Sequence, residues 1–550
     1  MVRLLSIPLA LLLLLAAAVV WSGGGSRQGA DFGFINRGEI GTLDPRGMSW
    51  LQDIRIAYAL WEGLYALDPQ TLDAIPGAAE RVELSADKTV YTFHIRPEAK
   101  WSNGDDVEAK DYVFAWRRSL EEPGDYSYLL YYIKGAQQYC EEFVAGKRPD
   151  FGKVGVEILA PKTLRVALKH PVTFFPELCA FPICFPQNER SMRPFAEKAD
   201  EKTGRVSYKQ EFTRPPNLVG NGPYRLAAWE FKRSLRLEAS EYYWDRQNVK
   251  SRVIEQLSAI DPQWAFLKYE SGAVDWLAEI SPELSSELMR RKRGDLRVFP
   301  GFGTYFYSIN CQAKLPDGRD NPFADVKVRQ AFSMAVNKQT IVTNITRLGE
   351  QPARTYVPLG IFPKYESPGG LPFDVKRAGE LLAEAGYPRG RSFPRVSLLY
   401  NNEGSHAEIA QYVRRQWLEN LGVEVDLEGV EIKVFTQRLH GKTYAVARAS
   451  WIGDYNDVST FSDKYLSFSE NNDSGWKSAA YDRLCDQAAY EGDAQKRLSL
   501  LAEAERILCE EAPIIPLYYY VNAYLFRDNV SGVPLNPRNM VMFKAVKARR

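Results

Sequence analysis

The sequence predicts an α/β fold built from more than one domain. A strand over 395–400, a helix over 407–421 and a strand over 423–427 follow one another, with apolar residues spaced as each element requires. Two strands joined in this way by one helix lie parallel in a sheet, and the connection is right-handed. At 550 residues the chain also exceeds what one hydrophobic core holds, so we expect roughly two to four domains.

Short helices and strands are predicted to alternate in the first part of the chain. Apolar spacing indicates a helix over 54–65, and alternating residues over 82–95 predict a β-hairpin. A second helix is expected over 107–118, where Asp105 or Asp106 would cap its first N–H groups. The mixed pattern therefore reaches back to the beginning of the chain.

Two apolar strands are predicted in the second half, over 302–310 and 514–520, and an amphipathic helix over 326–336. Phe302 and Tyr520 fall at the ends of the two predicted strands. A hinge needs only a few residues that absorb a change in backbone angles. These positions are therefore candidates for a hinge.

Composition limits the classes of function. The 70 basic and 69 acidic residues leave a net charge of +1, which gives no electrostatic reason to expect a nucleic-acid partner. The four histidines are scattered, and no phosphate loop or nucleophile elbow is present, so we expect no metal, no cofactor and no catalysis. Aromatic residues reach 13%, which fits a protein that lines a large cleft. A secreted carbohydrate-active enzyme is the second reading of that excess.

The N-terminal segment over 1–30 has the layout of an export signal. A basic start at Arg3 precedes an apolar run over 4–20 and a Gly-rich exit. The run is close to the ~20 residues that span a bilayer, so both a cleaved signal and an uncleaved N-terminal anchor remain open. No cysteine lies near the end of the run, which excludes anchoring through an N-terminal lipidated cysteine.

Six cysteines in an exported chain allow disulfides. Cys179 and Cys184 are near neighbours in sequence, and Cys485 and Cys509 flank a predicted helical hairpin over 481–510. Buried free thiols are equally compatible with these spacings. The pairing stays open at this point.

The stretch over 448–461 carries the most unusual arrangement of side chains. After a strand-like run, the Asp454 carboxylate stands between two aromatic residues, Trp451 and Tyr455, with Arg448 close by. A charged group between aromatic walls at a strand end suits the cationic head of a ligand. The alternative is a solvated loop after a strand.

Eight phrases of the chain, taken together, resemble one family. In order and spacing they are similar to the oligopeptide-binding proteins of bacterial peptide ABC importers. The phrases cover 79–96, 99–113, 219–224, 243–245, 323–331, 381–388, 448–461 and 512–520.

The resemblance implies a periplasmic-binding-protein type II-like α/β fold, with two lobes joined by a hinge and an extra inserted domain. It also implies a monomer in the periplasm or cell envelope, which binds an oligopeptide and delivers it to membrane permease and ATPase subunits. Murein peptide, a dipeptide or a signalling peptide are alternative ligands within the same fold. The implied parts are 31–61, 186–302 and 522–550 for the first lobe, 62–185 for the inserted domain and 303–521 for the second lobe.

The same resemblance assigns the peptide-binding residues. Asp454 takes the position whose carboxylate pairs with the peptide α-ammonium, and Trp451 walls the first pocket. Arg448 orients carboxylates or meets the far end of the peptide. The other implied cleft residues are His406, Tyr128, Tyr455 and Tyr520, with Asn221 and Gly222 in a loop near the hinge.

The chain departs from the family pattern where the other end of the peptide would lie. Ser49 stands in place of a glutamate, and Leu439 and Thr346 stand where basic residues are expected. Gly303 and Ile452 take the positions of two inter-strand cysteines. How the peptide carboxylate is held, and which peptide length is preferred, are therefore open.

Overall fold

The structure, a computed structural model, describes residues 29–36 and 38–549. The predicted export signal or anchor over 1–30 lies outside this part of the chain, apart from its last two residues. Among the described residues, no helix combines the length and the hydropathy of a membrane span.

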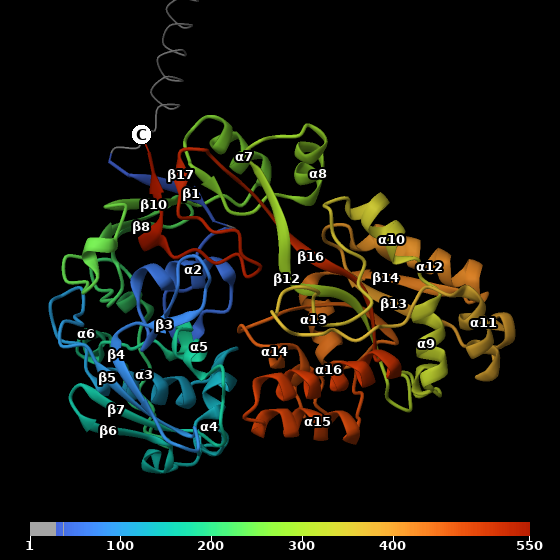
Figure 1. Ribbon diagram of the computed structural model, residues 1–550, viewed down its shortest axis with the longest axis horizontal. Coiled ribbons are helices and arrows are strands. Elements are labelled where there is room, and N and C mark those ends of the chain that lie inside the picture. The colour runs from blue at the N-terminus through green and yellow to red at the C-terminus, as the bar shows by residue number, and fades with distance from the viewer. Residues whose placement is uncertain (1–28, 37, 550) are drawn as a thin grey trace, which may run out of the picture.

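One ten-stranded sheet runs through the molecule, with helices packed around it, which confirms the α/β prediction. We call the part built on β1 and β8–β11 the first lobe, and the part built on β13–β15 the second lobe. Figure 1 shows them as a blue-to-green part and a yellow-to-orange part. The strand order is β14 (Val425–Val430), β13 (Val396–Asn401), β15 (Val446–Ile452), β12 (Leu296–Ile309), β16 (Ile514–Phe526), β11 (Trp276–Leu277), β1 (Phe32–Ile35), β10 (Val253–Leu257), β9 (Ser234–Ala239) and β8 (Tyr224–Glu230).

The long antiparallel strands β12 and β16 connect the two lobes (Figure 1). Phe302 and Tyr520 lie inside these strands, so the prediction that they end the strands is wrong. Pro300 and Gly301 read as strand breakers in the sequence, but the pairing absorbs them as a register shift between Pro300 and Thr304. The irregular pairing falls at the crossing between the lobes.

The strand–helix–strand prediction is confirmed in the second lobe. β13 and β14 pair in parallel, and α12 (His406–Leu421) connects them along the chain. The helix ends at Gly422, whose φ is 71°. The predicted amphipathic helix is α9 (Val326–Met334), whose apolar residues enter the core of this lobe.

A separate four-stranded antiparallel sheet lies beside the first lobe, in the order β4 (Ala79–Leu84), β5 (Val90–Ile95), β7 (Thr163–Ala167) and β6 (Val156–Ala160). Its β4–β5 pair confirms the predicted hairpin. The helix beside it, α3 (Ala109–Glu121), is capped by Glu108 with Asp111 in a capping box, so the expected cap at Asp105 or Asp106 is wrong. Asp106 bonds to Lys100 in the preceding turn instead.

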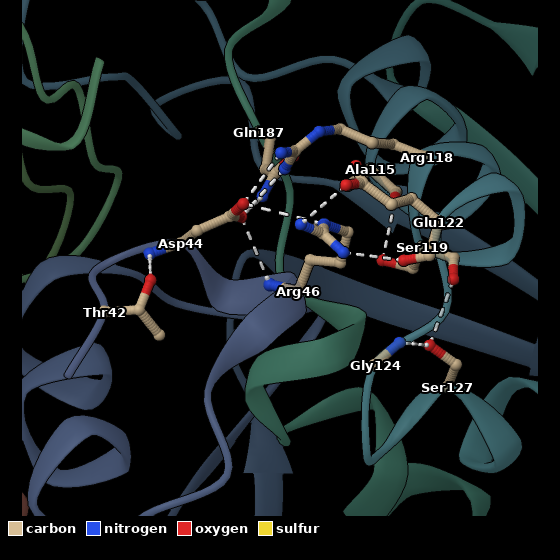
Figure 2. Close-up of polar contacts among 10 residues, drawn as sticks. All are labelled: Thr42, Asp44, Arg46, Ala115, Arg118, Ser119, Glu122, Gly124, Ser127 and Gln187. Atoms are coloured by element: carbon tan, nitrogen blue, oxygen red, sulfur yellow. Dashed lines mark hydrogen bonds and ion pairs between the residues drawn. The ribbon is translucent and has the colours of Figure 1, made fainter. Parts of the chain in front are cut away.

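A buried ion pair joins this sheet domain to the first lobe (Figure 2). Arg118 of α3 donates from both terminal nitrogens to the carboxylate of Asp44, over 2.8 and 2.7 Å. Gln187 donates to the same carboxylate over 3.0 Å. One hydrophobic core is continuous across both parts, so the two are packed as one body.

The helical hairpin is confirmed as α15 (Ala479–Tyr490) and α16 (Ala494–Glu511). Cys485 and Cys509 are free thiols in the structure, as are Cys179 and Cys184. The other α-helices of the described residues are α2 (Leu51–Leu60), α4 (Ala136–Val144), α5 (Phe175–Cys179), α6 (Glu189–Met192), α7 (Pro262–Glu270), α8 (Pro282–Arg290), α10 (Lys338–Thr340), α11 (Val375–Glu384), α13 (Ile432–His440) and α14 (Ser459–Ser462).

Candidate ligand-binding site

A cavity of about 650 Å³ lies between the two lobes, and we call it the inter-lobe cavity. The first lobe contributes residues from α2, from the segment after β11 and from the C-terminal segment. The second lobe contributes the start of α12 and the end of β15, and β16 crosses between the lobes. Lining side chains used below are Glu350, His406, Asp454, Tyr520, Arg538 and Asn539.

Asp454 reaches this cavity from a tight turn after β15. Gly453 packs against the ring of Phe302, where a Cβ atom would come within 2.2 Å of a ring carbon. The Asp454 N–H donates to the Thr460 hydroxyl over 2.8 Å, and Trp451 Nε1 donates to the Thr460 carbonyl over 2.7 Å. These bonds fix the direction of the Asp454 side chain.

The Asp454 carboxylate is held by hydroxyl groups rather than by an ion pair. Tyr128 donates to its Oδ2 atom, and no basic residue in the described part of the chain forms an ion pair with it. Burial raises the pKa of Asp454 to about 6, and Tyr128, Tyr126 and Arg538 offset burial only in part. A cation brought by a ligand would therefore stabilise the ionised form.

Arg538 and Asn539 of the cavity wall each have a buried polar atom that lacks a hydrogen-bond partner among the described residues. Arg538 pairs with Glu177 through Nη1, while its buried Nη2 atom has no acceptor. The buried Oδ1 atom of Asn539 has no donor. Because leaving a buried polar group unsatisfied costs about 1–3 kcal/mol, the wall is suited to a ligand with both donors and acceptors.

Three further predicted residues, His406, Tyr520 and Arg448, form one cluster with Tyr305 at the cavity wall. The Tyr305 hydroxyl lies 3.0 Å from His406 Nδ1, and Arg448 donates to the Tyr520 hydroxyl over 3.3 Å. The Arg448 guanidinium also lies over the Tyr305 ring. Burial, with Arg448 nearby, lowers the pKa of His406 to about 3, so this histidine is a neutral hydrogen-bonding group. His406 and Tyr520 line the cavity, and Arg448 orients them from behind.

Three of the predicted residues face a second cavity, of about 630 Å³, between the four-stranded-sheet domain and the second lobe. Tyr128, Trp451 and Tyr455 line it. The Tyr455 ring stacks on Phe174, and its hydroxyl donates to Asp463 over 3.1 Å. The structure therefore places Asp454 and its partner Tyr128 at the wall between the two cavities.

Asn221 and Gly222 are not among the residues that line either cavity. Asn221 accepts from the backbone N–H of Glu62 over 3.0 Å and donates to its carbonyl over 2.8 Å. A Cβ atom at Gly222 would lie 2.6 Å from the backbone of Leu60. These two residues fasten a loop to the end of α2.

Several cavity residues escaped the sequence analysis, because nothing near them in sequence marks them. Arg538 and Asn539 belong to the C-terminal segment, and Tyr126 to the four-stranded-sheet domain. Ser49 and Thr346 do line the cavity, whereas Leu439 is not part of its wall. Gly303 and Ile452 are register partners on β12 and β15.

Comparison with known proteins identifies the family. The family model described as "Bacterial extracellular solute-binding proteins, family 5 Middle" matches residues 73–473. The oligopeptide-binding protein OppA of Bacillus subtilis (strain 168) is 34% identical over 479 residues, 85% of this chain and 84% of the relative. The periplasmic oligopeptide-binding protein OppA of Salmonella typhimurium is 34% identical over 504 residues, 90% and 88% of the two chains.

Solved structures agree with the sequence relatives. The Escherichia coli murein tripeptide binding protein MppA superposes with a TM-score of 0.78 at 28% identity, over 95% of this chain and 99% of that one. Haemophilus influenzae OppA in complex with RPPGFSPFR gives a TM-score of 0.76 at 27% identity, with the same coverage. The chain belongs to the bacterial extracellular solute-binding proteins of family 5.

Proposed function

We propose that this protein captures oligopeptides in the inter-lobe cavity and delivers them to the permease and ATPase subunits of an ABC importer. The observation that carries the proposal is the Asp454 carboxylate, which faces the cavity without an ion-pair partner among the described residues. The printed names of the relatives, which include oligopeptide-binding proteins, support the same ligand class.

The peptide binds in an extended form with its α-ammonium on Asp454. A charge-assisted hydrogen bond of this kind contributes about 1.5–3 kcal/mol and sets the register from the amino end. The unpaired Nη2 donor of Arg538 can bond to a peptide carbonyl, and the unpaired Oδ1 acceptor of Asn539 can bond to a peptide N–H. Because every peptide carries these groups, recognition depends little on side chains.

The proposed working unit is an exported monomer in the periplasm or cell envelope, either free or tethered by its N-terminal segment. Its first lobe comprises 31–61, 186–302 and 522–550, and its second lobe 303–521. The domain over 62–185 moves with the first lobe, because the Asp44–Arg118 pair and the shared core tie the two together. Ligand then shifts the population towards the closed form.

The other readings of the sequence are weaker. The relatives reported above are named as binding proteins, which favours binding over carbohydrate chemistry. A murein peptide or a dipeptide would use the same ammonium clamp, so these ligands are variants of the proposal.

Purification followed by native mass spectrometry and calorimetry tests the function. We expect peptides to co-purify with the protein, and tri-alanine to bind the emptied protein with saturable heat. Turnover of an oligosaccharide by a protein that binds none of a set of di- to pentapeptides would contradict the proposal.

A further inference from the structure

Glu350 is a second carboxylate in the wall of the inter-lobe cavity, and no cation of the described chain pairs with it. Its side chain is 8% exposed, and its Oε2 atom accepts from the Leu348 N–H over 2.8 Å. Burial raises the pKa of this group, and nearby backbone N–H groups offset burial only in part. A buried carboxylate without a counter-ion is costly, so the site favours a cation from the ligand.

The sheet places Glu350 at a definable distance from Asp454. Asp454 follows β15, in which Ile452 pairs with Gly303 of β12. β12 in turn pairs with β16, and the Tyr519 N–H of β16 donates to the Gln351 carbonyl, next to Glu350. The backbones of β15 and Gln351 are three strand spacings apart, or roughly 14 Å, and Asp454 lies beyond the end of β15, so an extended peptide needs about four residues or more to reach both carboxylates.

The rest of the wall supplies little competing positive charge. Arg538 is already paired with Glu177, and His406 is neutral. A ligand cation that reaches Glu350 therefore meets a carboxylate that has no cation of the described chain beside it.

We propose that Glu350 selects peptides of about four residues or more that carry a lysine or arginine side chain at the third or fourth position. This inference rests on the proposed function, because the register is counted from an ammonium held at Asp454. An alanine at that position leaves Glu350 buried without a counter-charge. A glutamate there adds a like charge, which is unfavourable at this depth.

Calorimetry at pH 7.5 with Ala-Ala-Ala-Ala, Ala-Ala-Lys-Ala, Ala-Ala-Ala-Lys and Ala-Ala-Glu-Ala tests the proposal on the wild-type protein. We expect at least one lysine peptide to bind tenfold or more tightly than tetra-alanine, and the glutamate peptide to bind most weakly. In Glu350→Gln the lysine preference should fall below threefold. Glu366→Gln, an exposed glutamate outside the cavity, should keep the wild-type preference.

Each outcome bears on a defined claim. Equal affinity for the lysine and alanine peptides, or a lysine preference that survives in Glu350→Gln, overturns the role of Glu350 and leaves the proposed function standing. Failure of every peptide to bind the wild-type protein overturns both. The comparison among peptides on wild type needs no variant to fold, and the melting temperature of each variant checks that it is folded.

Discussion

Asp44 and Asp454 are both aspartates that link separate parts of the molecule, yet their surroundings act in opposite directions. Burial opposes the ionisation of Asp44, but Arg118, Arg46 and Gln187 together outweigh burial and lower the pKa of that carboxyl (Figure 2). Asp454 instead accepts hydrogen bonds from tyrosine hydroxyl groups and has no ion-pair partner among the described residues. Burial raises its pKa to about 6. A carboxylate that is paired with a cation inside the protein holds domains together. A carboxylate without an ion-pair partner at a cavity wall is suited to binding a cationic ligand.

The largest effect is expected from breaking the buried Asp44–Arg118 ion pair. Arg118→Met removes the bidentate partner of the buried Asp44 carboxylate and leaves it with the longer ion pair to Arg46, over 3.6 Å, which should reduce the free energy of unfolding by about 3 kcal/mol. Urea denaturation followed by circular dichroism measures this loss. Affinity for tri-alanine should change less than threefold in the variant, because the pair lies outside both cavities.

Arg117→Met is the matched control, because the neighbouring Arg117 pairs with Glu121 from a side chain that is 55% exposed. Its effect should stay below about 1 kcal/mol. Equal stability of the two variants would mean that the Asp44 pair does not tie the domains together.

The pH dependence of binding tests the role of the Asp454 carboxylate, which has no ion-pair partner among the described residues. Without ligand, Asp454 takes up a proton as the pH falls through about 6, and the peptide ammonium must then displace that proton. Affinity for tri-alanine should therefore fall about fivefold between pH 6 and pH 5, and should be nearly constant from about pH 6.5 to 7.5. Calorimetry in two buffers of different ionisation enthalpy should detect proton release at pH 5.

Asp463 complicates that profile, since burial raises its pKa to about 6 as well and it lines the neighbouring cavity. The profile of Asp454→Asn separates the two groups. A wild-type slope that persists in the variant would assign the titration to Asp463 and contradict the assignment to Asp454.

The sequence predicted most reliably what depends on neighbours in the chain. The parallel β13–β14 pair around α12 and the α15–α16 hairpin follow from local apolar spacing. The continuation of β12 through Pro300 and Gly301 did not follow, because pairing with β16 tolerates a bulge that local propensity reads as an end.

The candidate site divides in the same way. Asp454 and Trp451 stand out within one short stretch, so the sequence could mark them. Glu350, Arg538 and Asn539 enter the cavity from segments far from that stretch, and only the folded arrangement brings them to one wall. Asn221 shows the opposite error, because the sequence marked it as a cleft residue and the structure does not. Its turn-rich phrase belongs to the family pattern, but its side chain bonds to the backbone of Glu62.

The central claim, that Asp454 holds the peptide ammonium, is tested most directly by a cycle of two changes measured by calorimetry. Tri-alanine and N-acetyl-tri-alanine are compared on the wild-type protein and on Asp454→Asn, with Asp528→Asn as an exposed control. Acetylation should weaken binding tenfold or more on wild type and on the control, but less than threefold on Asp454→Asn. An equal penalty for acetylation on all three proteins would contradict the claim.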